Sequence, residues 1–465
     1  MNIAGIEFEQ LFVNLVYAVV TVTFVFTLDD LFIDLVALVR RLKPRRISLK
    51  ELMGMTETRQ KNIAIMIANW KEAEVIAPMI RGNIRGIKYE NYTFFLGVYP
   101  NDTETWREAK KLEELFPQRV MVVVNSMQGP TSKGQMLNEM ARRILESEVV
   151  SGIQYDLFLM QDSEDVLHPY SLTLLNQFSS QSEFIQIPVF SFDVPKRSLV
   201  AGVYIDEFSE SHTKDLLVRQ ELGAAIPSAG VGTLLSRELM LSAMLLQGGN
   251  FLKEDTLTED YHLGIMTKIM GFRSRFLCVQ IEMPRGSKEF IATREYFPSD
   301  FFASIRQKSR WTLGIAYQGL DNIQWQGSWV DRYFLLRDRK GPLNSALVIL
   351  SVIVLLGLAG FRLLSGRVPE MLNNPVFDTL IVLNAVNMLL RVFQRMWAVR
   401  RVNGWTQALM VPVRWLVANV VNVAATIKAH RTYRHSLKTG QKPAWVKTDH
   451  RLPAHFGKEV EVQTQ

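Results

Sequence analysis

The sequence is poor in cysteine: its 465 residues contain a single one, Cys278. An internal disulfide and a cysteine-ligated metal site are therefore both excluded, and a reducing compartment suits this composition. Internal repeats and low-complexity tracts are also missing from the sequence. The length exceeds that of a typical single domain, so we expect either one large domain with membrane segments or two to three domains.

Charged residues are missing from long stretches near the two ends. Residues 11–27 and 345–361 contain none, and a third apolar stretch covers 376–390. About 20 apolar residues suffice to cross the hydrocarbon core of a bilayer. The sequence thus predicts an N-terminal transmembrane anchor within residues 1–40 and a transmembrane hairpin over 343–393. A cleaved signal peptide is the competing interpretation of the first segment, but the basic residues follow the apolar stretch instead of preceding it.

The positive charges flank these segments. Basic clusters follow the first apolar stretch at 40–46 and the hairpin at 391–401. Because basic residues beside a span stay on the cytoplasmic side, they place the middle of the chain in the cytosol of a multi-pass membrane protein. The net charge of +7 is compatible with a nucleic-acid partner, but its distribution indicates membrane lipid and no nucleic acid.

The apolar stretch within 405–430 is interrupted by Arg414, Asn419 and Asn422, and Pro412 lies inside it. If it crossed the membrane, the basic tail at 431–465 would lie outside, against the positive-inside tendency. We therefore favour an interfacial helix over a transmembrane one, with the tail in the cytosol.

Between residues 48 and 340 strand-like and helix-like patterns alternate. Strands are expected at 61–68, 92–99, 120–124 and 157–160, and helices at 72–81, 105–115, 133–146 and 261–270. Such alternation is typical of an α/β domain with a parallel sheet covered by helices on both faces. Ligands of these sheets bind beyond the carboxyl ends of the strands, so the residues found there are the candidates for function.

Polar residues follow each of the first three strands or open the next helix. Trp70 offers an aromatic face and Glu72 a carboxylate to a nucleotide, Asp102 follows the second strand, and Lys133 opens a helix where it could meet a phosphate. Each of these positions also has a simple structural explanation, as a turn, a cap or a favourably placed helix charge.

An acidic cluster follows the fourth strand. Asp162, Glu164 and Asp165 lie within four residues, directly after a buried apolar segment. Gathering three carboxylates without a cation is costly, and oxygen ligands suit Mg²⁺ or Mn²⁺ bound together with substrate phosphates. We therefore predict a metal site at Asp162 and Glu164. A solvated acidic turn is the alternative.

Two further groups lie later in the chain. Glu259 and Asp260 precede a helix, where they either favour its first turn or supply a general base for an acceptor hydroxyl. Gln307, Arg310 and Trp311 lie in the basic segment 306–311 near the hairpin. This segment is either a basic amphipathic helix near the membrane or a site that holds a departing diphosphate.

The order of these groups resembles the processive, cellulose-synthase-like family 2 glycosyltransferases. Asp-x-Glu is followed by Thr-Glu-Asp and then by Gln-x-x-Arg-Trp just before a membrane hairpin. The segments 99–102, 129–133, 204–210, 227–233, 294–298 and 445–450 look like the bacteriophage adsorption protein B branch of that family. Glu164 departs from the family's second aspartate, and Ala68 stands where relatives often have proline.

The resemblance implies a GT-A fold and inverting transfer from a nucleotide sugar. Uridine is the implied nucleotide and an N-acetylhexosamine one candidate sugar. The acceptor would be a growing polysaccharide or a lipid-linked molecule for export, with an outer-envelope partner or a homo-oligomer completing the path. A non-catalytic scaffold or receptor component for phage adsorption is the alternative. The implied roles are catalytic for Asp260 with Glu259; donor-binding for Trp70, Glu72, Asp102, Lys133, Asp162, Gln307, Arg310 and Trp311; metal-binding for Asp162 and Glu164; and acceptor-facing for segment 228–233.

Overall fold

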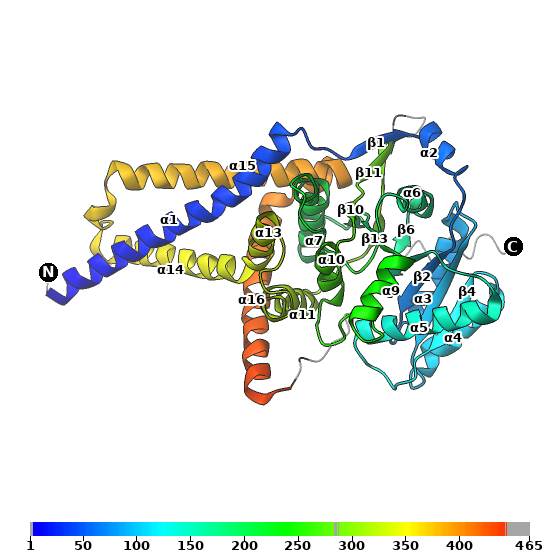
Figure 1. Cartoon of the computed structure of the whole chain (residues 1–465). Coiled ribbons are helices and arrows are strands. Elements are labelled where there is room, and N and C mark those ends of the chain that lie inside the picture. The colour runs from blue at the N-terminus through cyan, green and yellow to red at the C-terminus, as the bar shows by residue number, and fades with distance from the viewer. Residues whose placement is uncertain (1–2, 283–285, 287, 442, 444–465) are drawn as a thin grey trace.

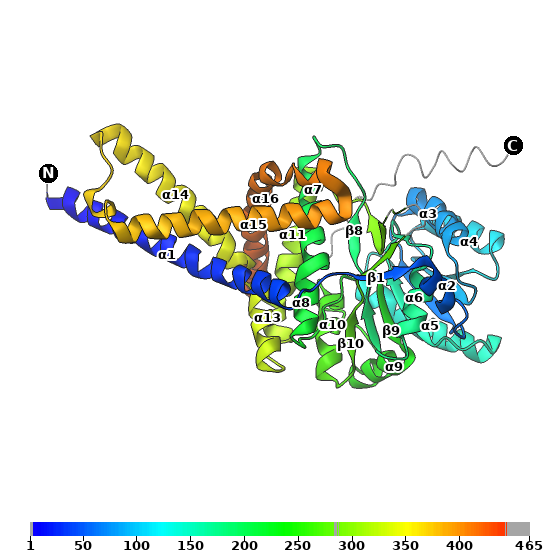
Figure 2. The same cartoon turned by 90° about the horizontal axis from the view of Figure 1, so that it is seen from above.

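The computed structural model describes residues 3–282, 286, 288–441 and 443. Most of the predicted tail, including the motif at 445–450, lies outside the described residues. The chain forms an α/β domain from which three long helices project to one side (Figures 1 and 2). This mixed architecture confirms the predicted fold class.

A seven-stranded sheet forms the centre of the domain, in the order β10-β7-β9-β5-β2-β3-β4. The strands β2, β3, β4 and β5 are parallel neighbours, whereas β9 runs antiparallel to both β5 and β7. The predicted four strands are confirmed, and the other three come from shorter segments. The bounds are β2 Ile63–Ala68, β3 Tyr92–Val98, β4 Val120–Val124, β5 Leu157–Gln161, β7 Phe184–Gln186, β9 Thr233–Ser236 and β10 Ser274–Phe276.

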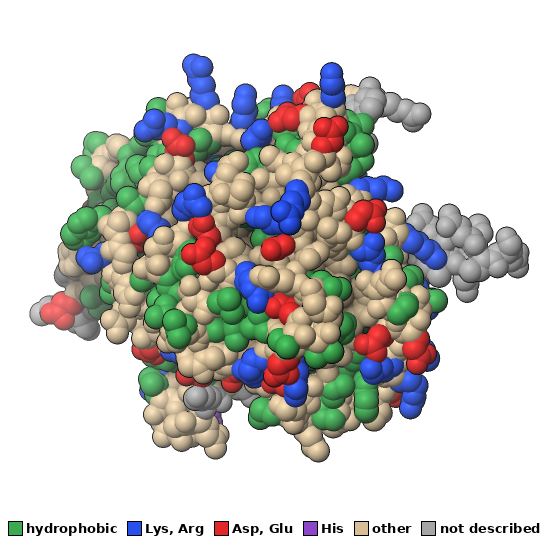
Figure 3. Space-filling model, turned by 45° about the vertical axis from the view of Figure 1, so that its right-hand side comes forward, with side chains coloured by type: hydrophobic (Ala, Val, Ile, Leu, Met, Phe, Trp, Pro, Cys, Tyr) green, Lys and Arg blue, Asp and Glu red, His purple; other side chains and the backbone are tan. Residues whose placement is uncertain are grey.

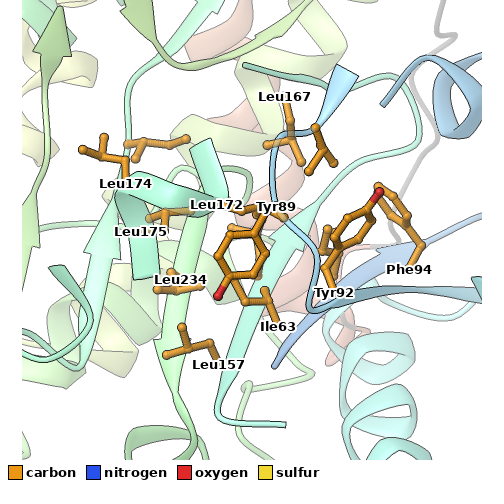
Figure 4. Packing of buried hydrophobic residues seen from close by; sticks show 14 of the residues in the cluster. Ile63, Tyr89, Tyr92, Phe94, Leu157, Leu167, Leu172, Leu174, Leu175 and Leu234 are labelled. Atoms are coloured by element: carbon orange, nitrogen blue, oxygen red, sulfur yellow. The ribbon is translucent and has the colours of Figure 1, made fainter. Parts of the chain in front are cut away.

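Alternate residues of the central strands enter two separate cores. Ile65 of β2 packs with Phe94 of β3 on the face covered by α3 and α6, while Met66 packs with Phe95 on the face covered by α5 and α9. Figure 4 shows the first of these cores. The near-continuous apolar strands follow from this burial on both faces. The helix bounds are α3 Ala73–Gly86, α4 Thr103–Leu115, α5 Lys133–Ser151, α6 Ser171–Phe178 and α9 Arg237–Leu246.

Two small sheets and several helices surround this core. One sheet has the order β1-β11-β12 and the other β6-β13-β8. Their strands are β1 Arg45–Ser48, β6 Val166–Leu167, β8 Val189–Ser191, β11 Val279–Glu282, β12 Lys288–Ile291 and β13 Thr293–Glu295. The helices are α2 Leu49–Met55, α7 Leu199–Glu210, α8 Leu216–Glu221, α10 Glu259–Ile269, α11 Phe301–Thr312, α12 Gly319–Asn322 and α13 Trp329–Arg339, with π-helical turns at Ser211–Asp215 and Leu313–Gln318. On the face shown in Figure 3, basic and acidic side chains are interspersed.

Three helices in the described part of the chain are long and apolar enough to cross a membrane: Glu7–Val39, Gly341–Ser365 and Pro375–Ala408. They belong to α1 (Ile3–Val39), α14 (Gly341–Ser365) and α15 (Pro375–Ala408). Helix α1 packs against both others. The turn between α14 and α15 lies beside the N-terminus, at the end of the bundle remote from the α/β domain (Figure 1).

Helix α1 continues through its acidic pair. Asp29 Oδ2 lies 2.6 Å from Arg337 Nη1, and Asp30 Oδ1 lies 2.9 Å from Arg337 Nη2. Lys340 pairs with both acids. These ion pairs neutralise Asp29 and Asp30, so the two charges do not prevent the helix from continuing beyond residue 30. The acids instead fasten the bundle to the α/β domain.

The helix α16 (Val411–Thr439) runs crosswise to the three projecting helices (Figure 1). It packs against α7 and α11 of the α/β domain. Its predicted range began at residue 405, but α15 extends to Ala408, with a kink at Gly404. The reason lies in the contact of α15 with α7, which prolongs α15 past the expected hairpin end at residue 393. Pro412 falls in the first turn of α16, where proline is tolerated.

Candidate active site

A single pocket at the carboxyl ends of the central strands collects most of the predicted residues. Its lining includes Trp70, Glu72, Lys133, Asp162, Glu164, Glu259, Asp260, Gln307, Arg310 and Trp311. These residues come from loops after β2 and β5 and from the first turns of α5 and α10, with α11 closing the opposite side. The fold thus brings together groups as far apart in sequence as Trp70 and Trp311.

An aromatic wall lies on the β2 side of the pocket. The rings of Trp70 and Tyr99 meet edge to face with centroids 5.3 Å apart. The Tyr99 hydroxyl lies 2.7 Å from Thr131 Oγ1. A Cβ at Gly129 would fall 2.6 Å from both Trp70 and Tyr99, so only glycine allows this close approach. The wall presents a fixed aromatic surface, as a planar base would require.

Of the predicted donor-binding residues, Asp102 alone does not line this pocket. Its carboxylate accepts hydrogen bonds from the Lys71 N–H at 2.5 Å and the Thr105 N–H at 3.4 Å. It therefore caps α4 and holds the turn that contains Trp70. Its position therefore fits a helix-capping role better than direct contact with the donor.

Lys133 stands at the centre of the charges in the pocket. Its Nζ lies 2.5 Å from Asp162 Oδ1 and donates to the carbonyl of Gly230 at 3.3 Å. Burial alone would lower the pKa of Lys133, but the carboxylates of Asp162, Glu259 and Asp260 raise it. The ammonium is therefore held charged, and a diphosphate entering the pocket would meet a fixed cation.

The neighbouring acids Glu259 and Asp260 open α10, and both are drawn into the protein. Burial, followed by repulsion from Asp260, raises the pKa of Glu259 to about 7. Burial also raises the pKa of Asp260, while Lys133 opposes this increase. A carboxylate of raised pKa is a stronger base than one in water, as proton removal from a hydroxyl demands.

The three acids after β5 are not gathered around one point. Asp162 pairs with Lys133, and Asp165 turns back to accept a 2.7 Å hydrogen bond from the Asp162 N–H. Burial, then Glu295 and the nearby acids, raise the pKa of Asp165 well above its usual range. Among the described residues there is no group of three or more His, Cys, Asp or Glu side chains that could hold a metal. Lys133 neutralises one of these acids, and the predicted metal site at Asp162 and Glu164 stays a prediction.

Asp162 and Glu164 nevertheless both line the pocket. Magnesium and manganese sites of nucleotide-using enzymes commonly have one or two protein carboxylates, and phosphates and water complete the shell. Two pocket carboxylates fit a metal held jointly with a diphosphate.

Helix α11 supplies the opposite wall. Gln307 is buried, and within the part of the chain that the structure describes its Oε1 has no hydrogen-bond partner. Trp311 meets the rings of Tyr204 and Phe208 edge to face, at 6.0 and 6.2 Å. This packing fixes the indole at the margin of the pocket.

Several pocket residues had no assigned role in the sequence analysis. Glu295 and Phe297 come from the segment 294–298, which carried only a family resemblance, and Phe208 from the segment 204–210. Phe297 stacks on Tyr204 with centroids 4.6 Å apart. Ala229, Gly230 and Val231 of the predicted acceptor segment also line the pocket. In the sequence these segments carried only the family resemblance, and no role in the pocket was assigned to their residues.

The fold is that of a GT-A glycosyltransferase domain. Residues 60–314, more than half of the chain, match the family described as "Glycosyltransferase like family 2", and the chain belongs to it. A mannosyltransferase from Pyrobaculum calidifontis, solved with GDP-Man and Mn²⁺, has a similar fold, with a TM-score of 0.55 at 14% identity over 91% of this chain and 98% of that one.

The chain is also similar to bacteriophage adsorption protein B of Escherichia coli K12, at 35% identity over 94% of its length. The bacteriophage N4 adsorption protein B of Escherichia coli O157:H7 matches equally. The chain spans 62% of the length of these relatives.

Proposed function

We propose that the protein is an inverting transferase of the bacterial inner membrane that moves a sugar from a nucleotide donor to a growing polysaccharide or a lipid-linked acceptor for export. UDP is the proposed nucleotide and an N-acetylhexosamine the first sugar to test. The observation that carries the proposal is the position of Lys133, between Asp162 on the donor side and Asp260 on the proposed acceptor side of one pocket.

The proposed reaction is a single in-line displacement. The acceptor oxygen forms a bond to the anomeric carbon as the bond from that carbon to the diphosphate oxygen breaks. Asp260 takes the proton of the attacking hydroxyl, and its raised pKa supports this role. Lys133, Gln307 and Arg310 surround the space for the departing diphosphate, and charge-assisted hydrogen bonds from them would stabilise its growing negative charge.

The donor side supplies binding and orientation. Trp70 would stack on the base, with Asp102 holding its turn in place. Asp162 and Glu164 would hold Mg²⁺ or Mn²⁺, which supplies Lewis-acid stabilisation of the diphosphate when bound. The structure of the Pyrobaculum mannosyltransferase with Mn²⁺ supports a divalent ion in this fold.

The catalytic domain is proposed to face the cytosol. Helices α1, α14 and α15 would cross the bilayer, and α16 would lie along its inner surface, because it runs crosswise to them and is not among the three candidate spans of the described chain. The basic residues Lys428, Arg431 and Arg434 would then remain on the cytoplasmic side.

A donor screen with the purified full chain tests the proposal. The protein is incubated with UDP- and GDP-sugars in Mg²⁺ or Mn²⁺, and released nucleotide and products are analysed by mass spectrometry. Asp260→Asn should reduce transfer by about 10²- to 10⁴-fold, the usual contribution of a positioned base, while donor binding by calorimetry stays near the wild-type value. Normal transfer by Asp260→Asn would exclude the assigned base. Failure to consume any donor would favour the scaffold alternative.

A further inference from the structure

A second cavity, of about 930 Å³, lies between the projecting helices and the catalytic domain. Trp311 lines both this cavity and the catalytic pocket. Glu207 lines the membrane-side cavity and its neighbour Phe208 the catalytic pocket. The two spaces thus adjoin at Trp311 and at the Glu207–Phe208 step of α7.

The part of the cavity along the bundle is mainly aliphatic, with Thr23, Ser351 and Asn384 as polar exceptions. Helices α1, α14 and α15 each contribute branched or unbranched apolar side chains, among them Val16, Val20, Leu355, Leu358, Ile381 and Met388. Between Arg391 and Phe377, both of which line the cavity, α15 rises by about 21 Å at 1.5 Å per residue. These walls have the chemistry and length of a site for a long hydrocarbon chain.

The part of the cavity beside the catalytic domain is polar, and we call it the collar. Its five cations are Lys308, Arg337, Lys340, Arg391 and Arg395. Each of them is already paired: Lys308 with Glu207, Arg337 and Lys340 with Asp30, and Arg391 and Arg395 with Glu210. Uncharged groups, Asn344, Ser345, Asn419, Asn422 and Thr426, complete the collar.

The ion pairs of the collar favour an uncharged sugar over a phosphate as the polar head of a ligand. A phosphate would have to compete with a carboxylate for every collar cation, at the cost of leaving that carboxylate unpaired. Sugar hydroxyls both donate and accept hydrogen bonds, so they can bond to the amides, the hydroxyls and the paired charges of the collar without breaking an ion pair. The indoles of Trp311 and Trp415, which also line the cavity, offer flat surfaces for a sugar ring.

On the basis of the transferase function proposed above, we infer that the acceptor is a lipid-anchored saccharide. Its hydrocarbon chain lies in the aliphatic groove between α1, α14 and α15. Its uncharged sugar head lies in the collar and reaches past Trp311 towards Asp260. A free polysaccharide would leave the aliphatic walls facing polar groups.

Photolabelling tests the inference without requiring catalysis. The full chain is placed in nanodiscs, free of glycoside detergent, and labelled with dodecyl N-acetylglucosaminide bearing a diazirine near the end of its alkyl chain. Labelled peptides should come from α1, α14 and α15. Unlabelled dodecyl N-acetylglucosaminide should compete, whereas free N-acetylglucosamine oligomers and dodecyl phosphate should not at the same concentration.

A pair of adjacent substitutions supplies the control. Ser351 lines the cavity, while the side chain of Val352 is 49% exposed on the outside of the same helix. Ser351→Trp should reduce the competed labelling about tenfold, equivalent to 1.4 kcal/mol of binding, and Val352→Trp should leave it unchanged.

Three results would overturn the inference. Labelling that no glycoside displaces indicates bulk membrane lipid, displacement by soluble oligomers indicates a path for free glycan, and stronger displacement by dodecyl phosphate indicates an anionic head. Asp260→Asn should label like the wild type. Wild-type protein that is labelled but transfers no sugar contradicts only the proposed reaction, and transfer without competed labelling contradicts only the lipid-anchored acceptor.

Discussion

Gly230 leaves the space that the Asp260 carboxylate occupies: a Cβ built on Gly230 would fall 2.6 Å from Asp260 Oδ2. Gly230 also has a φ of +79°, a conformation that side chains other than glycine rarely adopt. The acceptor-facing loop and the proposed base are therefore fitted to each other through the absence of one methyl group.

Gly230→Ala should consequently push the Asp260 carboxylate out of position. We expect transfer to fall by about 10²-fold, at the low end for loss of a positioned base, with donor affinity little changed. Gly223→Ala is the matched control, because Gly223 has a φ of +74° but no atom within 4 Å of a built Cβ. Equal loss in both variants would indicate backbone strain and not displacement of Asp260.

Removal of the Asp162 carboxylate should weaken donor binding. Asp162→Asn deletes the partner of Lys133 and one of the two proposed metal ligands. We expect an increase of about tenfold or more in the donor dissociation constant by calorimetry, equivalent to 1.4 kcal/mol per tenfold, and a loss of the response to Mn²⁺. Asp162→Glu, which keeps the charge, should recover part of both. Donor binding that stays metal-dependent in Asp162→Asn would argue against this site.

The stability of Glu259→Gln should depend on pH in a defined direction. The pKa of Glu259 is raised from 4.5 to about 7, so the folded protein holds this proton more tightly than the unfolded chain. The associated stabilisation is complete below pH 4.5 and is lost as the pH rises through 7. The glutamine variant lacks that loss. Its free energy of unfolding should exceed that of the wild type by about 1–3 kcal/mol above pH 8 and by little at pH 5. Thermal unfolding across this range measures the difference, and a difference independent of pH would contradict the raised pKa.

Arg414 should be important for stability although it is far from the reaction. Its side chain is fully buried, and its Nη2 lies 2.8 Å from Asp206 Oδ1 in α7. Arg414→Met should cost about 3–5 kcal/mol, since it leaves a buried carboxylate without its partner. Asp206→Asn in the same chain should recover part of the loss. Arg431→Met, on an exposed position of the same helix, should have little effect in the same thermal assay.

The position of α16 can be tested with reporters. Green fluorescent protein fused after Gly440 should fluoresce, and alkaline phosphatase at the same point should be inactive, because an in-plane α16 leaves this end in the cytosol. Phosphatase inserted between α14 and α15, at Arg367, should be active as a control. Phosphatase activity after Gly440 would instead make α16 a fourth span.

Local patterns were sufficient to predict four strands of the central sheet and the three apolar helices. Val120–Val124 has the predicted bounds, because a buried apolar strand is visible from its own residues. The partner of Asp162, in contrast, could not be predicted from local patterns. The cation beside Asp162 is Lys133, and the parallel order β5-β2-β3-β4 brings the segments that follow β4 and β5 to the same edge of the sheet.

Arg414 illustrates the same limit. In the sequence it interrupts an apolar stretch and indicates a polar face on an interfacial helix. In the structure it is among the most deeply buried side chains, since Asp206, some 200 residues earlier, compensates its charge. Asp102 was correctly expected to follow a strand, but in the structure it caps a helix and does not line the pocket. Partners that are distant in sequence decide both cases.

The packing of α16 on α7 and α11 has a consequence for the order of events during synthesis. The segment that supports the Gln307–Trp311 wall leaves the ribosome after α14 and α15 have emerged. Lys308 and Asn422 can form their hydrogen bond only then. A nascent chain that still lacks α16 holds donor-side residues but an unsupported acceptor wall. If the chain transfers sugar as proposed, transfer would thus begin only after the membrane helices and α16 have been made.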